Sequence, residues 1–423
     1  MSATATAPGV RSARRTWAPR PALRDPQFLR YLGGQAVSEL GDQVWYVAMM
    51  WSAVKLGSPA AAGVLLTLSS LPRLALLLFG GVVADRFDIR RLMIGSDVLR
   101  TLVAFAATAA AVVAPGVALL VVVTLVYGAV SGVFMPAAGA MQPRLLRADQ
   151  YNSGAVASSM LARFALSLGA PLGGVAVAVG GLPLALALDG FTFAVSVVTL
   201  ATVRPRPTEN GDRSVSTPGS RPTYLRDLAE GARFLFSHPV LAPVTAITLA
   251  ANLGFVGPMN IGMAELSSER GWGAGGVGLM LTGFGIGATV SALVQMRWKI
   301  RRHAGIWIAA VCAASGVAVL GMALAPSLAA AVAATTALGL SSGPMAVASS
   351  VLAQQHTPDA LRGRISSFNL LSAYGTVPIA SVGTGIAIAA IGVTGTFVAC
   401  AAIQATALLW LLAPEFRAAA IDS

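Results

Sequence analysis

Long apolar stretches separated by short polar loops recur along the whole chain. About twelve stretches reach about 20 residues, the length that a helix needs to cross the roughly 30 Å hydrocarbon layer of a bilayer. This pattern predicts an all-α protein that crosses the membrane many times. The expected spans fall near residues 28–54, 60–83, 92–113, 117–140, 153–178, 182–202, 240–266, 275–296, 304–324, 327–351, 365–390 and 393–412.

The composition is typical of a membrane protein. Of the 423 residues, 56% are hydrophobic and 11% are charged, which is about half the charged share of an average soluble chain. The net charge of +12 comes from basic residues spread over short loops, so it does not form the basic patch that nucleic-acid binding needs. Cys312 and Cys400 lie in different apolar stretches, and we interpret them as small core residues.

The basic residues alternate between the loops. Arginines precede the first span, follow the second, fourth and eighth, and precede the eleventh, whereas the loops on the other side contain little more than Lys55 and Arg270. Because basic loops stay in the cytoplasm, this alternation predicts that both termini are cytoplasmic. The first apolar stretch is too long for a signal peptide and no small-residue cleavage site follows it, so we expect no signal peptide.

One long hydrophilic stretch divides the chain into two halves. We expect a basic cytoplasmic tail at 1–27, a six-helix bundle at 28–203, a cytoplasmic linker at 204–239, a second six-helix bundle at 240–413 and a cytoplasmic tail at 414–423. Leu225, Leu228, Ala232 and Leu235 share one helical face of the linker, which predicts an amphipathic helix on the membrane surface.

The two halves resemble each other in sequence. The segment "GVFMPAAGAMQPRLLRADQYNSG" closes the fourth span, and "SSGPMAVASSVLAQQHTPDALRGR" closes the tenth, about 210 residues later. Each contains Gly and Pro within the span, then Gln, then a polar loop with Asp and basic residues. Two six-helix bundles in tandem, related by an axis along the membrane normal, are the architecture of major facilitator transporters.

A motif after the second span carries a more specific resemblance. The segment "GGVVADRFDIRRLM" is similar to the loop motif of the major facilitator superfamily, with Asp88 where the usual form has glycine. The variant resembles the drug:proton antiporter branch, which includes macrolide, tetracycline and enterobactin-type siderophore exporters. Gly41–Asp42, "GAPLGG" in the fifth span and "LRGRISS" before the eleventh extend the resemblance over nearly the whole chain. The motif residues are Gly81, Asp85, Arg86, Asp88, Arg90 and Arg91.

The motif predicts a gate between the two halves. Gly81 would let two helices approach closely, and Asp85 would face the positive N-terminal dipole of the eleventh span near Ser366 when the cytoplasmic side is closed. The alternative is that the arginines of the motif only set the topology. The corresponding gate residues of the second half are Arg362, Gly363 and Arg364.

Two carboxylates, Glu39 and Asp42, lie inside the first span. They are three residues apart and therefore share one helical face. Exposing both acids to lipid in their ionised form would cost about 5–7 kcal/mol, so we expect them to face the bundle interior. Either one acid, Glu39 before Asp42, titrates as protons and substrate exchange, or Glu39–Arg73 and Asp42–Arg163 are static ion pairs. Asp189 lies in the sixth span, which packs outside the cavity in this superfamily, so we interpret it as structural.

Other chemistries find no support in the sequence. No Gly-Lys-Ser/Thr phosphate loop and no nucleophile–base pattern occur. His238, His303 and His356 fall in separate cytoplasmic loops without metal-ligand spacing, and we interpret them as surface residues. We therefore expect neither an enzyme nor a cofactor or metal site.

The expected function is proton-coupled efflux of a small amphipathic organic compound, such as an antibiotic, drug or siderophore. A monomer in the bacterial inner membrane would use the proton-motive force and alternating access. The alternatives are an importer or lipid mover with the same fold, and a membrane scaffold or sensor without transport. The family resemblance implies that spans one, four, seven and ten line the cavity. Each candidate lining residue could instead be an ordinary helix-packing residue. The candidates are Gln43, Tyr46, Met50, Tyr127, Phe134, Asn252, Phe255, Met259 and Asn260.

Overall fold

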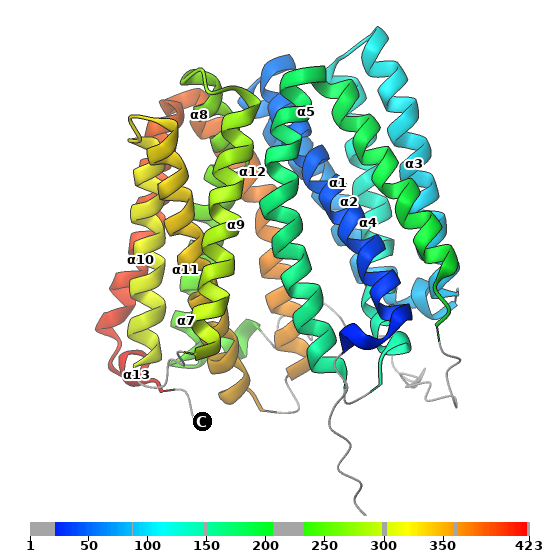
Figure 1. Cartoon of the computed structure of the whole chain (residues 1–423). Coiled ribbons are helices and arrows are strands. Elements are labelled where there is room, and N and C mark those ends of the chain that lie inside the picture. The colour runs from blue at the N-terminus through cyan, green and yellow to red at the C-terminus, as the bar shows by residue number, and fades with distance from the viewer. Residues whose placement is uncertain are drawn as a thin grey trace, which may run out of the picture.

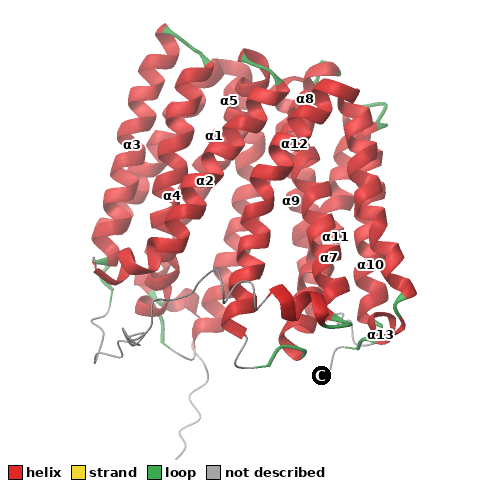
Figure 2. Ribbon diagram, turned by 180° about the vertical axis from the view of Figure 1, so that it is seen from behind, coloured by secondary structure: helices red, strands yellow, loops and turns green. Residues whose placement is uncertain are grey.

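The computed structural model describes residues 22–86, 88–147, 150–205, 232–297, 303–358 and 362–420. Nearly all of these residues are helical, and none of them forms a strand (Figure 2). The prediction of an all-α fold is therefore confirmed. Figure 1 shows two groups of helices: α1 to α5 form the N-terminal half, and α7 to α13 form the C-terminal half.

The N-terminal half begins with a short 3-10 turn, η1 (Ala22–Arg24), followed by α1 (Pro26–Leu56), α2 (Pro59–Arg86), α3 (Ile89–Val113), α4 (Val117–Leu145) and α5 (Tyr151–Thr202). The long α5 contains the fifth and sixth predicted spans. The chain reverses between them at Gly181, whose φ of 64° and ψ of −160° are open to glycine and strained for residues with a Cβ.

The C-terminal half repeats this plan. Its seventh span consists of α7 (Leu241–Gly257), the π-helical segment η3 (Pro258–Gly262) and α8 (Met263–Glu269). A second glycine with positive φ, Gly392, divides α12 into the eleventh span and the start of the twelfth. The remaining elements are α9 (Gly273–Arg297), α10 (Ala304–Ala323), α11 (Leu328–Gln355), α12 (Arg362–Ala405), η5 (Thr406–Leu412) and α13 (Pro414–Ala418).

The predicted spans agree with these helices. Eight helical stretches of the described chain are long and apolar enough to cross a membrane, and two of them, Ser153–Thr202 and Gly375–Leu412, contain two predicted spans each. The first two predicted spans are α1 and α2. Large apolar side chains also cover the outer surface, and Val113 and Leu412 are 85% and 84% exposed. This surface fits a bundle surrounded by lipid.

The two halves meet along two helix pairs, α5 with α9 and α2 with α12. Glycines make this approach close: an ideal Cβ on Gly278 of α9 would lie 2.6 Å from the carbonyl oxygen of Ala170, and one on Gly63 of α2 would lie 2.6 Å from that of Ser381. We call the end at which α1 begins the basic end, and the other the opposite end. Gly63 and Gly278 follow the starts of α2 and α9, so both contacts lie toward the opposite end.

The predicted amphipathic helix is only partly described. Leu225 and Leu228 lie outside the described residues, whereas residues 232–237 are helical. Leu235 is 1% exposed and forms an apolar cluster with Leu241 and Ile365. The described end of this helix therefore packs against α7 and α12, and its position on the membrane surface stays a prediction.

Candidate functional site

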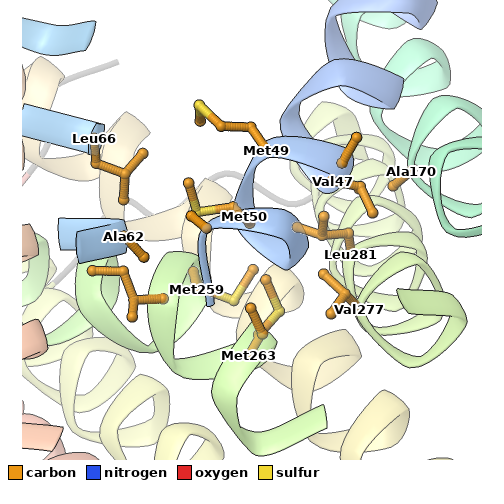
Figure 3. Packing of buried hydrophobic residues seen from close by; sticks show 14 of the residues in the cluster. Val47, Met49, Met50, Ala62, Leu66, Ala170, Met259, Met263, Val277 and Leu281 are labelled. Atoms are coloured by element: carbon orange, nitrogen blue, oxygen red, sulfur yellow. The ribbon is translucent and has the colours of Figure 1, made fainter. Parts of the chain in front are cut away.

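Apolar side chains from both halves fill the interior toward the opposite end. Figure 3 shows Met50 of α1 close to Met259 of η3 and Met263 of α8, whereas Met49 points to another side of α1. Ala62 and Leu66 of α2 and Val277 and Leu281 of α9 belong to the same cluster (Figure 3). Met50 and Met259, two predicted cavity residues, are only 1% and 4% exposed, so they contribute to this apolar closure.

A cavity of about 670 Å³ lies within the C-terminal half. It extends from Phe255 and Leu338 in the middle of the bundle to Thr357 and Ile365 at the basic end. Of the predicted cavity residues, Asn252 and Phe255 line it. No charged side chain is among the described residues of its lining. The hydroxyl groups that line it belong to Thr245, Thr248, Ser315, Ser341, Ser342, Ser349, Ser350 and Thr357.

The other cavity candidates of spans one and seven lie at helix contacts or in the half-buried interior. The side chain of Gln43 lies against Gly169 of α5, where an ideal Cβ would meet its Cβ at 2.7 Å. Tyr46 is half-buried. The amide of Asn260 donates a hydrogen bond to the carbonyl oxygen of Val256 within the π-helical seventh span. Such π-helical segments are often found at functional sites.

The acids of α1 face a charged interior. Oε2 of Glu39 is buried without a hydrogen-bond partner in the described part of the chain. Asp42 interacts electrostatically with Arg100 most strongly and with Arg73 next. The side chain of Arg163 lies outside the described residues, so the expected pair with Asp42 stays a prediction.

The sequence analysis missed an ion pair on α3. Asp97 and Arg100 are buried, and their charged groups are 3.7 Å apart. Ser196 of α5 donates a 2.7 Å hydrogen bond to Oδ2 of Asp97. The guanidinium of Arg100 lies 4.8 Å from the ring centre of Phe134 and 5.1 Å from that of Phe193, which is a cation–π geometry. Phe134, predicted to line the cavity, therefore packs against this arginine.

Tyr127 and Asp189 form a second buried polar contact. The tyrosine hydroxyl donates a 2.8 Å hydrogen bond to Oδ2 of Asp189, which is fully buried. The ring of Tyr127 lies edge-on to Trp45 and Phe193, with centroid distances of 5.5 and 5.7 Å. Tyr127, another predicted cavity residue, is thus held in the core of the N-terminal half.

Part of the loop motif has a structural role at the start of α3. Asp88 caps this helix, because its carboxylate accepts a 2.9 Å hydrogen bond from the backbone N–H of Arg91. Arg90 donates to the carbonyl oxygens of Leu200 and Ala201 at the end of α5. Arg91 is exposed. The surroundings of the remaining gate residues are not among the described parts of the structure, so the gate stays a prediction; these residues are Gly81, Asp85, Arg86, Arg362, Gly363 and Arg364.

The "GAPLGG" segment of the fifth span packs α5 against two helices. Gly169 and Gly173 lie against Gln43 and Val44 of α1, and Gly174 lies against Ala274 of α9. An ideal Cβ at any of these glycines would approach the neighbouring helix to 3.0 Å or less. The segment therefore joins the first span to the interface between the halves.

Two of the three histidines lie together at the basic end. The rings of His238 and His356 are half-buried with centroids 5.4 Å apart, so the interpretation of both as separate surface residues is wrong, whereas His303 is exposed. Nδ1 of His238 accepts hydrogen bonds from the backbone N–H groups of Val240 and Leu241. Burial, and then the charge of His356, lower the pKa of His238, while Glu415 opposes the shift.

Cys312 and Cys400 are both buried, as expected for small core residues. In the described part of the chain, no group of three or more His, Cys, Asp or Glu side chains is arranged to hold a metal ion. The chemistry of the site is therefore that of an apolar, hydroxyl-lined cavity in one half and buried charges in the other.

Comparisons with known proteins agree with this architecture. The sequence model of the Major Facilitator Superfamily matches residues 31–264. Multidrug efflux pump Tap of Mycolicibacterium fortuitum is 27% identical over 377 residues, covering 85% of this chain and 88% of the relative. Multidrug efflux pump Tap of Mycobacterium tuberculosis is 25% identical over 416 residues, covering 94% of this chain and 96% of the relative.

Solved structures share the fold at low identity. The nucleoside transporter NupG (D323A mutant) superposes with a TM-score of 0.70 at 15% identity, covering 91% of this chain and 99% of that structure. A bacterial homologue of the iron transporter ferroportin in an inward-facing state gives a TM-score of 0.67 at 13% identity, covering 92% of this chain and 99% of that structure.

The chain belongs to the Major Facilitator Superfamily. It is a multi-pass membrane protein and a transporter, not an enzyme.

Proposed function

We propose that the protein exports a small amphipathic organic compound, such as a drug or antibiotic, in exchange for protons. The observation that carries this proposal is the cavity of about 670 Å³ in the C-terminal half, with apolar and hydroxyl groups and no charge on its described lining. Pockets of this size and character bind drug-sized organic molecules. The whole-length similarity to proteins named multidrug efflux pumps supports export as the direction.

Buried acids of the N-terminal half support proton coupling. Glu39 and Asp42 lie inside α1, and Glu39 has a buried oxygen without a hydrogen-bond partner among the described residues. A carboxyl group in such surroundings can exchange a proton when its exposure to water changes. We assign the exchanged proton to this pair, with Glu39 as the first candidate. The motif residues from Gly81 to Arg91 and Arg362 to Arg364 would form the cytoplasmic gate.

Alternating access would connect the cavity and the acids. The halves contact each other toward the opposite end, where Met50 and Met259 are buried, and the cavity extends toward the basic end. We propose that this arrangement faces the cytoplasm, and that rocking of the halves exposes the cavity to the other side. The protein would act as a monomer in the bacterial inner membrane, with both termini and the basic end in the cytoplasm.

Single-cysteine labelling tests this topology. The two native cysteines are buried, so a membrane-impermeant maleimide should react with introduced cysteines only. Cysteines at Ser2, Ser216 and Ser423 should react from the cytoplasmic side, and cysteines at Ser58 and at Glu269, the exposed last residue of α8, from outside. The reverse labelling of either set would contradict the proposed orientation.

Transport in everted membrane vesicles tests the function. With an acidic lumen, vesicles that contain the protein should accumulate ethidium or tetracycline, and collapse of the pH gradient should stop accumulation. Vesicles without the protein are the control. Removal of substrate from the lumen would favour an importer, and no movement of either compound in either direction would contradict the proposed drug transport.

A further inference from the structure

Acids outnumber bases in the described interior of the N-terminal half. The described interior has two arginines, one on α2 and one on α3, for four carboxyl groups on α1, α3 and α5. Even if Arg163, whose side chain is not described, also faces the interior, the acids still outnumber the arginines. The four acids are Glu39, Asp42, Asp97 and Asp189, and the two arginines are Arg73 and Arg100.

Arg100 is already bound to other groups. It forms the 3.7 Å ion pair with Asp97, donates a 2.9 Å hydrogen bond to Ser131 and lies over the rings of Phe134 and Phe193. These partners come from α3, α4 and α5, so the guanidinium is held from several sides. Arg100 therefore neutralises Asp97 first and acts on other acids only from a distance.

Of the two fully buried acids, Asp97 and Asp189, Asp189 has the poorer compensation. Its side chain is fully buried, and Tyr127 donates to Oδ2, but Oδ1 has no hydrogen-bond partner among the described residues. It forms none of the ion pairs found in the described chain. A buried carboxylate with one hydrogen bond and no base is strongly disfavoured, and the group becomes neutral instead.

Gly41 lets Asp189 approach α1 one residue before Asp42. An ideal Cβ on Gly41 would overlap with Oγ1 of Thr192 and lie 2.9 Å from Oδ1 of Asp189. The missing side chain thus lets the second part of α5 touch α1 one residue before Asp42. Asp42 is half-buried, whereas Asp189 is fully enclosed, so Asp42 is the member of the pair that water can reach.

We propose that Asp189 and Asp42 form one shared proton site, in which Asp189 holds the proton on Oδ1 and Asp42 passes it to water. In the transfer, the O–H bond of Asp189 breaks and an O–H bond forms on Asp42. Two adjacent carboxyl groups favour one shared proton, because both charges together repel. This inference deepens the proposed proton coupling and rests on it. It makes Asp42, rather than Glu39, the acid of α1 that carries the exchanged proton, and it gives Asp189 a role beyond the structural one that its position in the sixth span indicates.

The groups around the site define its charge balance. Glu39 faces it from α1, Arg73 from α2, Asp97 and Arg100 from α3, and Tyr127 from α4. When the proton leaves Asp189, the Tyr127 hydroxyl and the positive charge of Arg100 remain to stabilise the carboxylate. The negative charge of Asp97 partly cancels the positive charge of Arg100 at Asp189, so the proton on Asp189 stays exchangeable.

Infrared spectroscopy of the purified full-length protein tests the site independently of transport. At neutral pH the wild type should show a protonated carboxyl C=O band, and Asp189→Asn should lack one component of it. Tyr127→Phe should shift that component, because its hydrogen bond to Asp189 is lost. Asp189→Asn should keep the wild-type melting temperature, since one neutral group replaces another, whereas the control Asp97→Asn should lower it by leaving Arg100 unpaired.

An unchanged carboxyl band in Asp189→Asn, or a loss of stability as large as that of Asp97→Asn, would overturn the inference. In vesicles, Asp189→Asn should lose ethidium accumulation driven by a pH gradient while it still equilibrates ethidium downhill. Normal pH-driven accumulation by Asp189→Asn would also overturn it and leave the proposed function intact. If instead the wild type shows the Asp189 band but no pH-driven transport, the shared proton on Asp189 is supported and the proposed coupling is wrong.

Discussion

The hydroxyl of Tyr127 on α4 donates a 2.8 Å hydrogen bond to Oδ2 of Asp189 on α5 in the fully buried core of the N-terminal half. Trp45 of α1 and Phe193 of α5 pack edge-on against the tyrosine ring. This contact therefore joins the first, fourth and sixth spans beside the acids of α1. It connects helix packing with the charges that we propose to couple transport.

Replacement of Tyr127 by Phe measures the charge state of Asp189. If Asp189 is neutral, the loss of one hydrogen bond should lower the free energy of unfolding by about 1 kcal/mol. If it is charged, the loss should be larger, because hydrogen bonds to charged groups contribute about 1.5–3 kcal/mol. Thermal unfolding in detergent gives the difference. Tyr46→Phe is the control, since Tyr46 makes no hydrogen bond in the described contacts, and this variant should unfold like the wild type.

Two glycines of α1 make a matched pair for testing the approach of α5. Gly41→Ala should destabilise the protein by about 1–3 kcal/mol, because the new methyl group overlaps with Thr192 and crowds Asp189. Gly33→Ala on the same helix meets nothing within 4 Å and should be neutral or stabilising by up to about 1 kcal/mol. Equal melting temperatures for the two variants would contradict the close contact at Gly41.

The ion pair on α3 predicts strong coupling between two substitutions. Arg100→Gln alone leaves Asp97 buried and unpaired, and it should cost about 3–5 kcal/mol. The double variant Asp97→Asn with Arg100→Gln should recover much of this loss, because neither charge remains alone. The comparison of single and double variants by thermal unfolding gives the coupling energy. Additive losses would show that the two side chains act independently.

The histidine pair at the basic end predicts a pH dependence of stability. The lowered pKa of His238 means that the unfolded chain binds this proton more readily than the folded chain. The neutral form of His238 therefore contributes fully to stability above about pH 6.5. This contribution is lost as the pH falls through the lower pKa of the folded state. Protonation of Nδ1 would also remove the acceptor for the N–H groups of Val240 and Leu241.

His238→Asn tests this pH dependence, because asparagine keeps a capping acceptor but does not titrate. Melting temperatures measured from about pH 7.5 to about pH 5 should fall less steeply in this variant than in the wild type. His303→Asn, at an exposed position, should follow the wild type. The same slope in all three proteins would contradict the role of His238.

The sequence predicted the helices more completely than the charges. Apolar stretches located every span, since a membrane-spanning helix needs a continuous apolar length whatever its neighbours are. Glu39 and Asp42 stood out for the same reason. Asp97 and Arg100 carry an equal signal, two charges three residues apart inside a span, and could have been found in the same way.

The partners of these charges could not be predicted from one sequence. Ser196 lies about 100 residues from Asp97, and its hydrogen bond depends on how α3 packs against α5. The enclosure of Met50 and Met259 likewise depends on contacts between the halves, which an apolar pattern does not specify. His238 and His356 meet because α7 begins where α11 ends, a proximity that loop positions alone do not reveal.

The central claim is that acids of α1 and α5 exchange protons for the exported substrate. Proton movement caused by added substrate tests this claim most directly. Everted vesicles with an acidic lumen and a lumenal pH indicator should become less acidic when ethidium is added, because each exported molecule drives protons out. Vesicles with Asp42→Asn should show no such change, although ethidium still equilibrates. Ethidium accumulation by the wild type without any change of lumenal pH, or an unchanged proton response in Asp42→Asn, would contradict the claim.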